Sequence, residues 1–259
     1  MHMKSHLAVL LSSLFCLQSV FAFSPYETYL MSGRETHVGL VAAITPEKLS
    51  LFEDTFRKCN SQPVRAELKH AGITSVQAFM RNIEGKDYAV VYFAYAGGNQ
   101  YLGAAAAFEK ATRSLDWKAA TSSHPRAQTY DRHWLQMEWI NFVHGLDVDR
   151  DPTSTLMIAT TVLPEKEMEY RTLHQTVWPG VVDQAVRGQI RNLNVFLVEL
   201  DDQLVEFLYL EYMGSDQPAD DVANRADPIN QRWWKLTDAC QRPFSDVTDG
   251  VWTSMSPVK

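Results

Sequence analysis

The chain has 259 residues, of which 46% are hydrophobic and 21% are charged, a balance typical of a soluble globular protein. Its formal net charge of -7 and its isoelectric point near 5.6 argue against a nucleic-acid partner, which would require a basic patch or stripe. Small neutral ligands are compatible with this charge, and the length allows one large domain or two of roughly 100–120 residues.

Residues 1–22 have the pattern of a signal peptide. Lys4 and His6 precede an apolar stretch from Leu7 to Val20, and Ala22 places a small residue at the expected cleavage position. The apolar run is too short for a comfortable membrane span. We therefore expect cleavage near Phe23, export to the periplasm or the medium, and no stable membrane insertion of the mature chain. A retained N-terminal anchor is the alternative.

The next part of the chain, residues 36–147, predicts four strands and helical connections. A short alanine run, Ala104 to Ala107, favours a helix by propensity and has no binding pattern. The strands are expected near His37–Ile44, Ile73–Arg81, Tyr88–Ala94 and Trp134–Phe142. A polar linker, DVDRDP (147–152), separates this unit from the rest.

The remaining residues, 153–259, predict the order β-α-β-β-α-β. A β-branched run, Thr155 to Val162, is followed by Pro164, which can open a helix because its missing N–H needs no partner there. The other expected elements are a helix to about Thr176 that resumes at Pro179 and runs to Gly188, a strand hairpin at 194–200 and 204–212, helices over 219–240 broken at Pro228, and a closing strand near 251–255.

The two units are related by a nearly constant offset in residue number. ITPEK (44–48) returns as VLPEK (162–166), 118 positions later. The same offset or 117 relates seven further pairs: Pro125 and Pro243, Asp131 and Asp249, Trp134 and Trp252, Met137 and Met255, Tyr92 and Tyr209, Tyr95 and Tyr212, and Trp117 and Trp234. Chance matches would not keep one offset over so long a stretch, so we predict two homologous units at 36–147 and 153–259.

Each predicted unit places two helices on one face of a four-stranded antiparallel sheet, the ferredoxin-like arrangement of the α+β class. The other sheet face is also apolar and needs a cover. The second copy can supply it, so we expect two tandem ferredoxin-like repeats packed as an intramolecular α+β barrel. Such a pseudo-dimer could function as a monomer.

The second unit carries a group of residues suited to sugar chemistry. Tyr170 and His174 are four residues apart on a helix and therefore project from one face, and Trp178 follows a turn later. Imidazole titrates near neutral pH, and opening a cyclic hemiacetal needs a proton delivered and another removed. The adjacent Trp233 and Trp234 could stack on the C–H faces of a sugar.

The order Tyr-x-x-x-His-x-x-x-Trp-Pro, a hairpin, then Gln-Arg-Trp-Trp-Lys (231–235) is similar to the L-rhamnose mutarotase family over residues 153–245. The resemblance implies a dimeric α+β barrel that interconverts the α and β anomers of L-rhamnose without metal or organic cofactor. It implies that His174 donates the proton and that Tyr170, Trp233 and Trp234 bind sugar. A further sugar-binding tyrosine of the family falls at Leu193 or Asn194 here, which leaves the sugar open.

The same residues are compatible with other roles and other functions. His174 alone could be a satisfied surface residue, and one tryptophan of the pair could be core, since neighbours on a helix point about 100° apart. A non-catalytic carbohydrate-binding protein could retain the aromatic platform. A different enzyme, such as a lyase or a monooxygenase-like protein, could reuse the barrel pocket.

The first unit lacks this group of residues. Phe52 and Phe56 stand where the second unit has Tyr170 and His174, and Asp116-Trp117 replaces the tryptophan pair. We expect this unit to be structural. Its histidines and tryptophans leave a second site between the sheets as an alternative; they are His37, His124, His133, His144, Trp134 and Trp139.

Cysteine spacing gives no sign of a metal or disulfide framework. After cleavage only Cys59 and Cys240 remain, in predicted helical stretches of different units, and no CxxC or HExxH motif occurs. An oxidising compartment would permit a bond between them, but we expect two packed thiols.

Overall fold

A computed structural model of the protein describes residues 36–97, 101–144 and 150–259. The predicted signal peptide, 1–22, and residues 147–149 of the predicted linker lie outside these residues. None of the helices in the described part of the chain is both long and apolar enough to cross a membrane. We call residues 36–144 the first half and residues 150–259 the second half.

The first half alternates long strands with pairs of helices. Its elements are β1 (Thr36–Ile44), α3 (Leu49–Arg57), α4 (Gln62–His70), β2 (Ile73–Ile83), β3 (Lys86–Tyr95), α5 (Ala104–Ala111), α6 (Trp117–Ala120), β4 (Thr121–Ser122), α7 (Pro125–Gln128), β5 (Leu135–Gln136) and β6 (Glu138–His144). The strands predicted from the sequence are all present here.

The second half repeats the order of strands and helices that the first half has from β1 to β4. Its elements are β7 (Ser154–Val162), a 3₁₀ turn (Pro164–Lys166), α8 (Glu167–Gln175), α9 (Pro179–Arg187), β8 (Ile190–Leu200), β9 (Gln203–Tyr212), α10 (Gln217–Ala226), α11 (Pro228–Asp238), β10 (Gln241–Arg242), β11 (Thr253–Ser254) and β12 (Ser256–Pro257). The helix breaks fall at Pro179 and Pro228 as predicted, since proline fits the first helical position. The strand β8 begins four residues earlier than expected.

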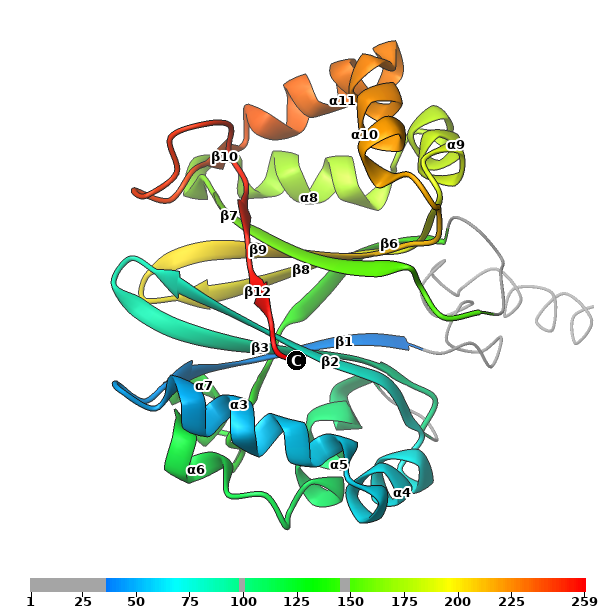
Figure 1. The fold of residues 1–259 in the computed structure, drawn as a ribbon. Helices are drawn as coiled ribbons and strands as arrows, with labels where there is room; N and C mark the ends of the chain where they lie inside the picture. Colours follow the sequence, from blue (N-terminus) through cyan, green and yellow to red (C-terminus); the bar gives the residue numbers. More distant parts are fainter. Residues whose placement is uncertain (1–35, 98–100, 145–149) are drawn as a thin grey trace, which may run out of the picture. The chain divides into compact units, whose positions relative to one another are not determined.

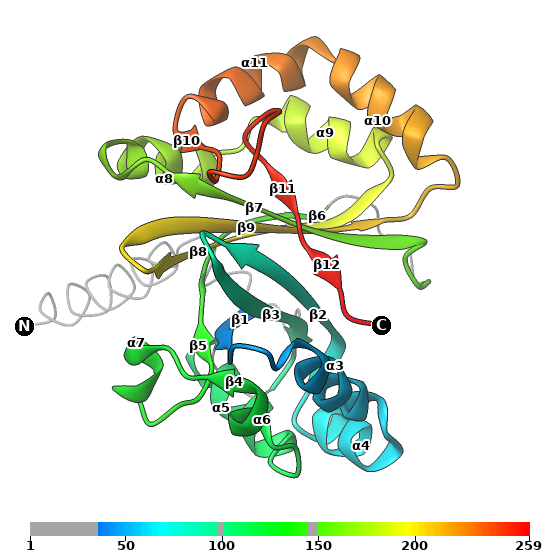
Figure 2. The same ribbon diagram turned by 60° about the vertical axis from the view of Figure 1, so that its left-hand side comes forward.

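The strands form two antiparallel sheets, ordered β12-β2-β3-β1-β4 and β10-β7-β9-β8-β6, with β5 beside β1 and β11 beside β7. The sheets face each other, and the helices of each half cover the outer face of one sheet (Figures 1 and 2). The predicted fold class is confirmed: the protein is an α+β barrel of two ferredoxin-like layers.

The last strand of each half crosses to the other sheet. After β5 pairs with β1, the chain continues as β6 and pairs with β8; after β11 pairs with β7, it continues as β12 and pairs with β2. At each crossing a methionine amide still donates to the half's own first strand, Met137 to Gly39 and Met255 to Met157. The strand predicted near 251–255 closes its own unit only over β11, and the chain beyond it joins the other sheet as β12.

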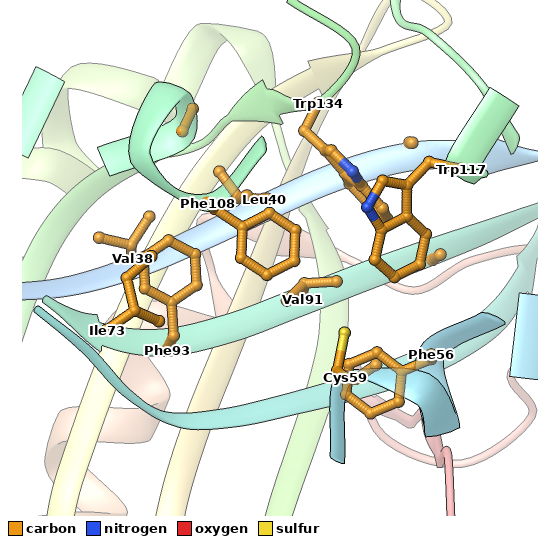
Figure 3. Packing of buried hydrophobic residues seen from close by; sticks show 14 of the residues in the cluster. Val38, Leu40, Phe56, Cys59, Ile73, Val91, Phe93, Phe108, Trp117 and Trp134 are labelled. Atoms are coloured by element: carbon orange, nitrogen blue, oxygen red, sulfur yellow. The ribbon is translucent and has the colours of Figure 1, made fainter. Parts of the chain in front are cut away.

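Strand alternation assigns each side chain to a layer. Between the sheets lies a core built from both halves, including Val41, Phe79, Phe196 and Phe207. Beneath the first half's helices lies a second, aromatic-rich core that includes Phe56, Phe108, Trp117 and Trp134 (Figure 3). Full burial of each large apolar side chain contributes about 1.5–3 kcal/mol, so these cores dominate the folding energy.

The predicted cysteine state agrees with the structure. Cys59 and Cys240 are buried free thiols, one in each half.

Candidate functional site

Helix α8 brings Tyr170 and His174 together on its inward face. The two positions are one helical turn apart, and their rings lie 4.2 Å apart between centroids. Tyr170 is fully buried and His174 is 8% exposed. The imidazole is thus held against a rigid ring while one side of it stays within reach of the surface.

The hydrogen bonding of His174 fixes its tautomer. Its Nδ1 lies 3.1 Å from the carbonyl oxygen of Tyr170, so Nδ1 carries the proton and donates it to that acceptor. Nε2 then keeps its lone pair and has no hydrogen-bond partner in the described part of the chain. Burial lowers the pKa of His174 to about 4, against the opposing effect of the bond to Tyr170. The imidazole is therefore neutral at pH 7.

One tryptophan contacts this histidine, a second packs on the first, and a third follows it on α11. Trp233, on α11, meets the His174 ring edge-on at 5.7 Å, and Trp178 meets Trp233 at 5.5 Å. Trp233 is 6% exposed, whereas Trp178 and Trp234 are half-buried. The guanidinium of Arg232 lies 5.8 Å over the Trp178 ring. Trp233 thus packs against the site, and the two half-buried rings keep surface that a ligand can use.

A buried polar cluster that was not predicted from the sequence lies behind Tyr170. Glu206 on β9 is fully buried, and Gln241 on β10 donates from Nε2 to its Oε2 at 2.8 Å. The same amide nitrogen lies 3.5 Å from the Tyr170 hydroxyl. Burial raises the pKa of Glu206 to about 8, and hydrogen bonds from Tyr170 and Gln241 limit the rise. Glu206 is therefore mostly a neutral acid at pH 7.

The full burial of Tyr170 bears on its predicted role. Burial, and next the neighbouring Glu206, raise the pKa of its phenol well above the usual value. Its hydroxyl points into the Glu206–Gln241 cluster and its ring supports His174. That sugar touches Tyr170 stays a prediction; the contacts favour a positioning role.

The sheet face beneath these helices is only partly covered. Leu156, Ile158, Leu208 and Leu210 alternate with residues of the inter-sheet core and so face the helices, yet all four are only half-buried. The corresponding residues of the first half are fully buried at 0%: Val38, Leu40, Val91 and Phe93. The second half therefore leaves apolar sheet surface accessible next to its histidine.

The two candidate positions for a second sugar-binding tyrosine lie on opposite faces of the sheet. Leu193 pairs with Leu210 and shares its helix-facing side, and it is half-buried. Asn194 points between the sheets, is fully buried, and accepts from the indole N–H of Trp139 at 3.0 Å. Of the two candidate positions, only Leu193 therefore lies on the helix-facing side of the sheet, where the candidate site is.

The first half's equivalent region is filled. Phe52 and Phe56 are buried with ring centroids 6.4 Å apart, and Trp117 packs 6.2 Å from Phe52. Ala89 stands at the register position of Glu206, since Met80 pairs with Ala89 as Leu197 pairs with Glu206. No titratable group replaces His174 at Phe56.

The first half's histidines do not form one cluster. His37 lies between the sheets, 2.7 Å from the Tyr92 hydroxyl, and burial followed by the nearby His144 lowers its pKa to about 3. His133 contacts Thr121 at 2.7 Å on the helical side, and His124 caps α7.

A surface cavity of about 450 Å³ lies away from Tyr170, His174 and the three tryptophans of the second half. It is bordered by the end of β1, the β2–β3 hairpin, the segment before α7 and the β8–β9 turn, with Tyr88, His124 and Asp201 in its wall. The Tyr88 hydroxyl donates to Asp201, and Lys86 lies 3.2 Å from the same carboxylate. These polar groups therefore mainly join the hairpin tips of the two halves.

Comparison with known proteins locates the resemblance in the second half. Residues 155–258 match the sequence model of L-rhamnose mutarotase. A curated L-rhamnose mutarotase from Oceanobacillus iheyensis is 29% identical over 86 residues, which cover 33% of this chain and 78% of that protein. The likeness predicted from the Tyr-His-Trp pattern is confirmed for this part of the chain.

Among solved structures, a monooxygenase candidate from Fusobacterium nucleatum subsp. nucleatum superposes with a TM-score of 0.50. The match has 9% identity and covers 87% of this chain and 93% of that one. At so low an identity the likeness concerns the fold, and it extends over both halves.

Proposed function

We propose that the second half is an aldose mutarotase that interconverts the α and β anomers of L-rhamnose or a related 6-deoxy sugar. The observation that carries this proposal is His174: a neutral, nearly buried imidazole with an unpartnered Nε2, set among aromatic rings. The match of residues 155–258 to L-rhamnose mutarotase supports the same reaction.

The proposed chemistry uses His174 as a proton shuttle. Nε2 accepts the proton of the anomeric hydroxyl while the bond between C1 and the ring oxygen breaks, which gives the open aldehyde. The imidazolium then returns that proton to the ring oxygen. Rotation about the C1–C2 bond and the reverse sequence close the ring on the other face, so the proton balance is complete without metal or cofactor.

The surroundings fit the sugar class. The half-buried rings of Trp178 and Trp234 offer flat surfaces for sugar C–H groups. The half-buried leucines of the sheet face offer an apolar contact for a methyl group at C6. Leu193 in place of a tyrosine removes one hydroxyl, so we expect a sugar selectivity that differs from that of the family.

We further propose that the mature protein acts outside the cytoplasm as a single chain, because residues 1–22 have a signal-peptide pattern and each sheet is completed within the chain. The sugars reaching it would then be extracellular or periplasmic.

Saturation-transfer NMR on the anomeric protons tests the reaction directly. We expect faster exchange for at least one of L-rhamnose, L-fucose, L-lyxose and D-galactose. The variant His174→Ala should reduce the enhancement to background, while Phe56→Leu, the matched position in the first half, should leave it unchanged. Absence of enhancement with all four sugars would contradict the proposal, and binding without exchange would favour a carbohydrate-binding protein.

A further inference from the structure

We propose that Glu206 is a positioning residue of the His174 site, a buried acid that holds the Tyr170 ring and, through it, the imidazole. The proposal deepens the function proposed above, on which its activity measurements rest. Its structural part concerns the geometry of His174 and stands independently of the sugar.

The contacts form a continuous path from the sheet to the histidine. Glu206 projects from the central strand β9 on the side of the helices and is held by Gln241 at 2.8 Å. Gln241 also lies 3.5 Å from the hydroxyl of Tyr170, whose ring lies 4.2 Å from that of His174. The hydroxyl end of Tyr170 is thus fixed by the cluster, and its ring face sets where the imidazole can rest.

The two halves provide an internal control for this path. The registers of the paired strands place Ala89 at the position of Glu206 and Thr121 at that of Gln241, since Gln241 pairs with Val162 as Thr121 pairs with Ile44. Helix α3 carries Phe52 and Phe56 in place of Tyr170 and His174. The carboxyl, the amide and the phenol therefore occur together with the histidine and are absent together where it is absent.

The buried acid at this position lowers the stability of the fold. Full burial of a polar side chain costs free energy when its hydrogen bonds are incomplete, and Oε1 of both Glu206 and Gln241 lacks a partner among the described residues. An alanine, as in the first half, would avoid that cost. The buried acid therefore points to a role in arranging the site rather than in stabilising the fold.

The protonation state of Glu206 decides whether the path is intact. The titratable groups around it are Tyr170 on α8 and, beyond the phenol, His174 on α8 and Cys240 after α11; its other strand neighbours are Thr160 and Leu197. No cation among these groups compensates a buried carboxylate. Ionisation above about pH 8 would therefore put an unpaired charge behind Tyr170 and disturb the ring that supports His174.

The test compares Glu206→Gln and Glu206→Leu with Glu211→Gln. Glu211 is a buried acid on the same strand, but it faces the other sheet and pairs with Arg191 at 2.6 Å. Imidazole ¹⁵N NMR reports the tautomer and environment of His174, and anomer exchange is measured from pH 5 to 9.5. We expect wild-type exchange to fall with a midpoint near pH 8.

Glu206→Gln, which keeps a neutral polar group, should retain exchange within about threefold of wild type at pH 7, leave the His174 signals in place and remove the alkaline fall. Glu206→Leu should displace the His174 signals and lower exchange at least tenfold, as expected for a group that orients a catalytic one. Glu211→Gln should leave both the His174 signals and the alkaline fall unchanged.

Thermal unfolding gives a readout that needs no sugar. The folded-state pKa of Glu206 is raised from 4.5 to about 8, so its contribution to stability is full below pH 4.5 and is lost as the pH rises towards 8. The Tm of Glu206→Gln relative to wild type should therefore increase between pH 5 and pH 8.

An unchanged Tm difference, or His174 signals that stay in place in Glu206→Leu, would overturn the proposal. If Glu206→Leu does not fold, an alkaline fall that persists in Glu206→Gln overturns it instead. A wild-type protein without anomer exchange would refute the mutarotase function alone, because the NMR and Tm measurements would still decide the role of Glu206.

Discussion

The space between helices and sheet differs sharply between the two halves. In the first half it is a closed core of large aromatic and aliphatic side chains, in which Phe52, Phe108 and Trp134 are at most 1% exposed. In the second half the buried hydrophobic cluster is reduced to four residues, which are Val162, Tyr170, Leu197 and Cys240. A layer that keeps a histidine and two indoles accessible cannot also be closed, so the second half contributes less to stability than the first.

The exchanged strands explain how such a half can stay folded. Strand β6 belongs to the first half by sequence and to the second half's sheet by pairing, and the inter-sheet core contains residues of both. Free energy gained in the first half is thereby shared with the second. We interpret the first half as a stabilising partner for a site that is costly to fold.

The largest effect that distinguishes the halves is expected for their tryptophans. Trp117 is 5% exposed, packs 5.4 Å from Trp134, and donates from its indole to Thr112 at 2.9 Å. Trp117→Ala should lower the free energy of unfolding by about 4 kcal/mol, the usual range for a buried aromatic side chain. Trp234→Ala, at a half-buried position, should cost less than about 2 kcal/mol and instead weaken sugar binding.

Urea unfolding measures both variants, and NMR titration with L-rhamnose measures binding. Equal stability losses would show that Trp234 is core like Trp117 and would remove it from the site. A full loss of binding in Trp117→Ala at a urea concentration where the protein remains folded would contradict the structural role assigned to the first half.

An intermediate effect is expected when the residues at one equivalent position are interchanged. Phe56→His puts an imidazole without a partner into an apolar core and should cost about 2–3 kcal/mol at pH 7. His174→Phe removes a buried polar group and should cost less than about 1 kcal/mol or be stabilising, while it abolishes catalysis. Urea unfolding at pH 7 measures the change in unfolding free energy of Phe56→His and of His174→Phe, with Phe56→Leu as the size control.

The pH dependence of the stability of His174→Phe, relative to wild type, tests whether His174 is a buried neutral imidazole. Because the folded-state pKa of His174 is lowered to about 4, its contribution to stability is present above pH 6.5 and is lost as the pH falls towards 4. His174→Phe should therefore gain stability relative to wild type on acidification. A strong loss of stability in His174→Phe at every pH would mean that the histidine is structural.

Much of this comparison could be predicted from the sequence, because it depends on local spacing. The constant offset, the strands, the breaks at Pro179 and Pro228, and the loss of Tyr170 and His174 at Phe52 and Phe56 are all local patterns. The accessible leucines could not be predicted in the same way, because Leu156 and Val38 have the same polarity and differ only in what covers them.

Part of the Glu206 cluster is visible in the sequence, as an acid within an apolar strand. In the apolar strand 204–212, Glu206 shares the parity of Leu204, Leu208 and Leu210, so an acid on the helix-facing side could have been noticed. Its partner Gln241 follows a helix in a two-residue strand, and only the tertiary fold brings it within 2.8 Å. The strand crossings could not be predicted either, because residues 135–144 have the pattern of one strand in the sequence, although the pairing partner changes at Met137.

The smallest effect concerns the exchanged strand at the end of the chain. Strand β12 forms only two residue pairs with β2, and the Val258 amide donates to Ala78 at 2.9 Å. Deleting residues 256–259 should therefore cost about 1–2 kcal/mol, the value of one or two net hydrogen bonds and a partly buried valine. Urea unfolding measures it, with deletion of Lys259 alone as the control. A loss above about 3 kcal/mol would mean that pairing of β12 with β2 is a main source of stability between the two sheets. A small loss would leave β6 as the exchanged strand through which the first half stabilises the second, since β6 makes six residue pairs with β8.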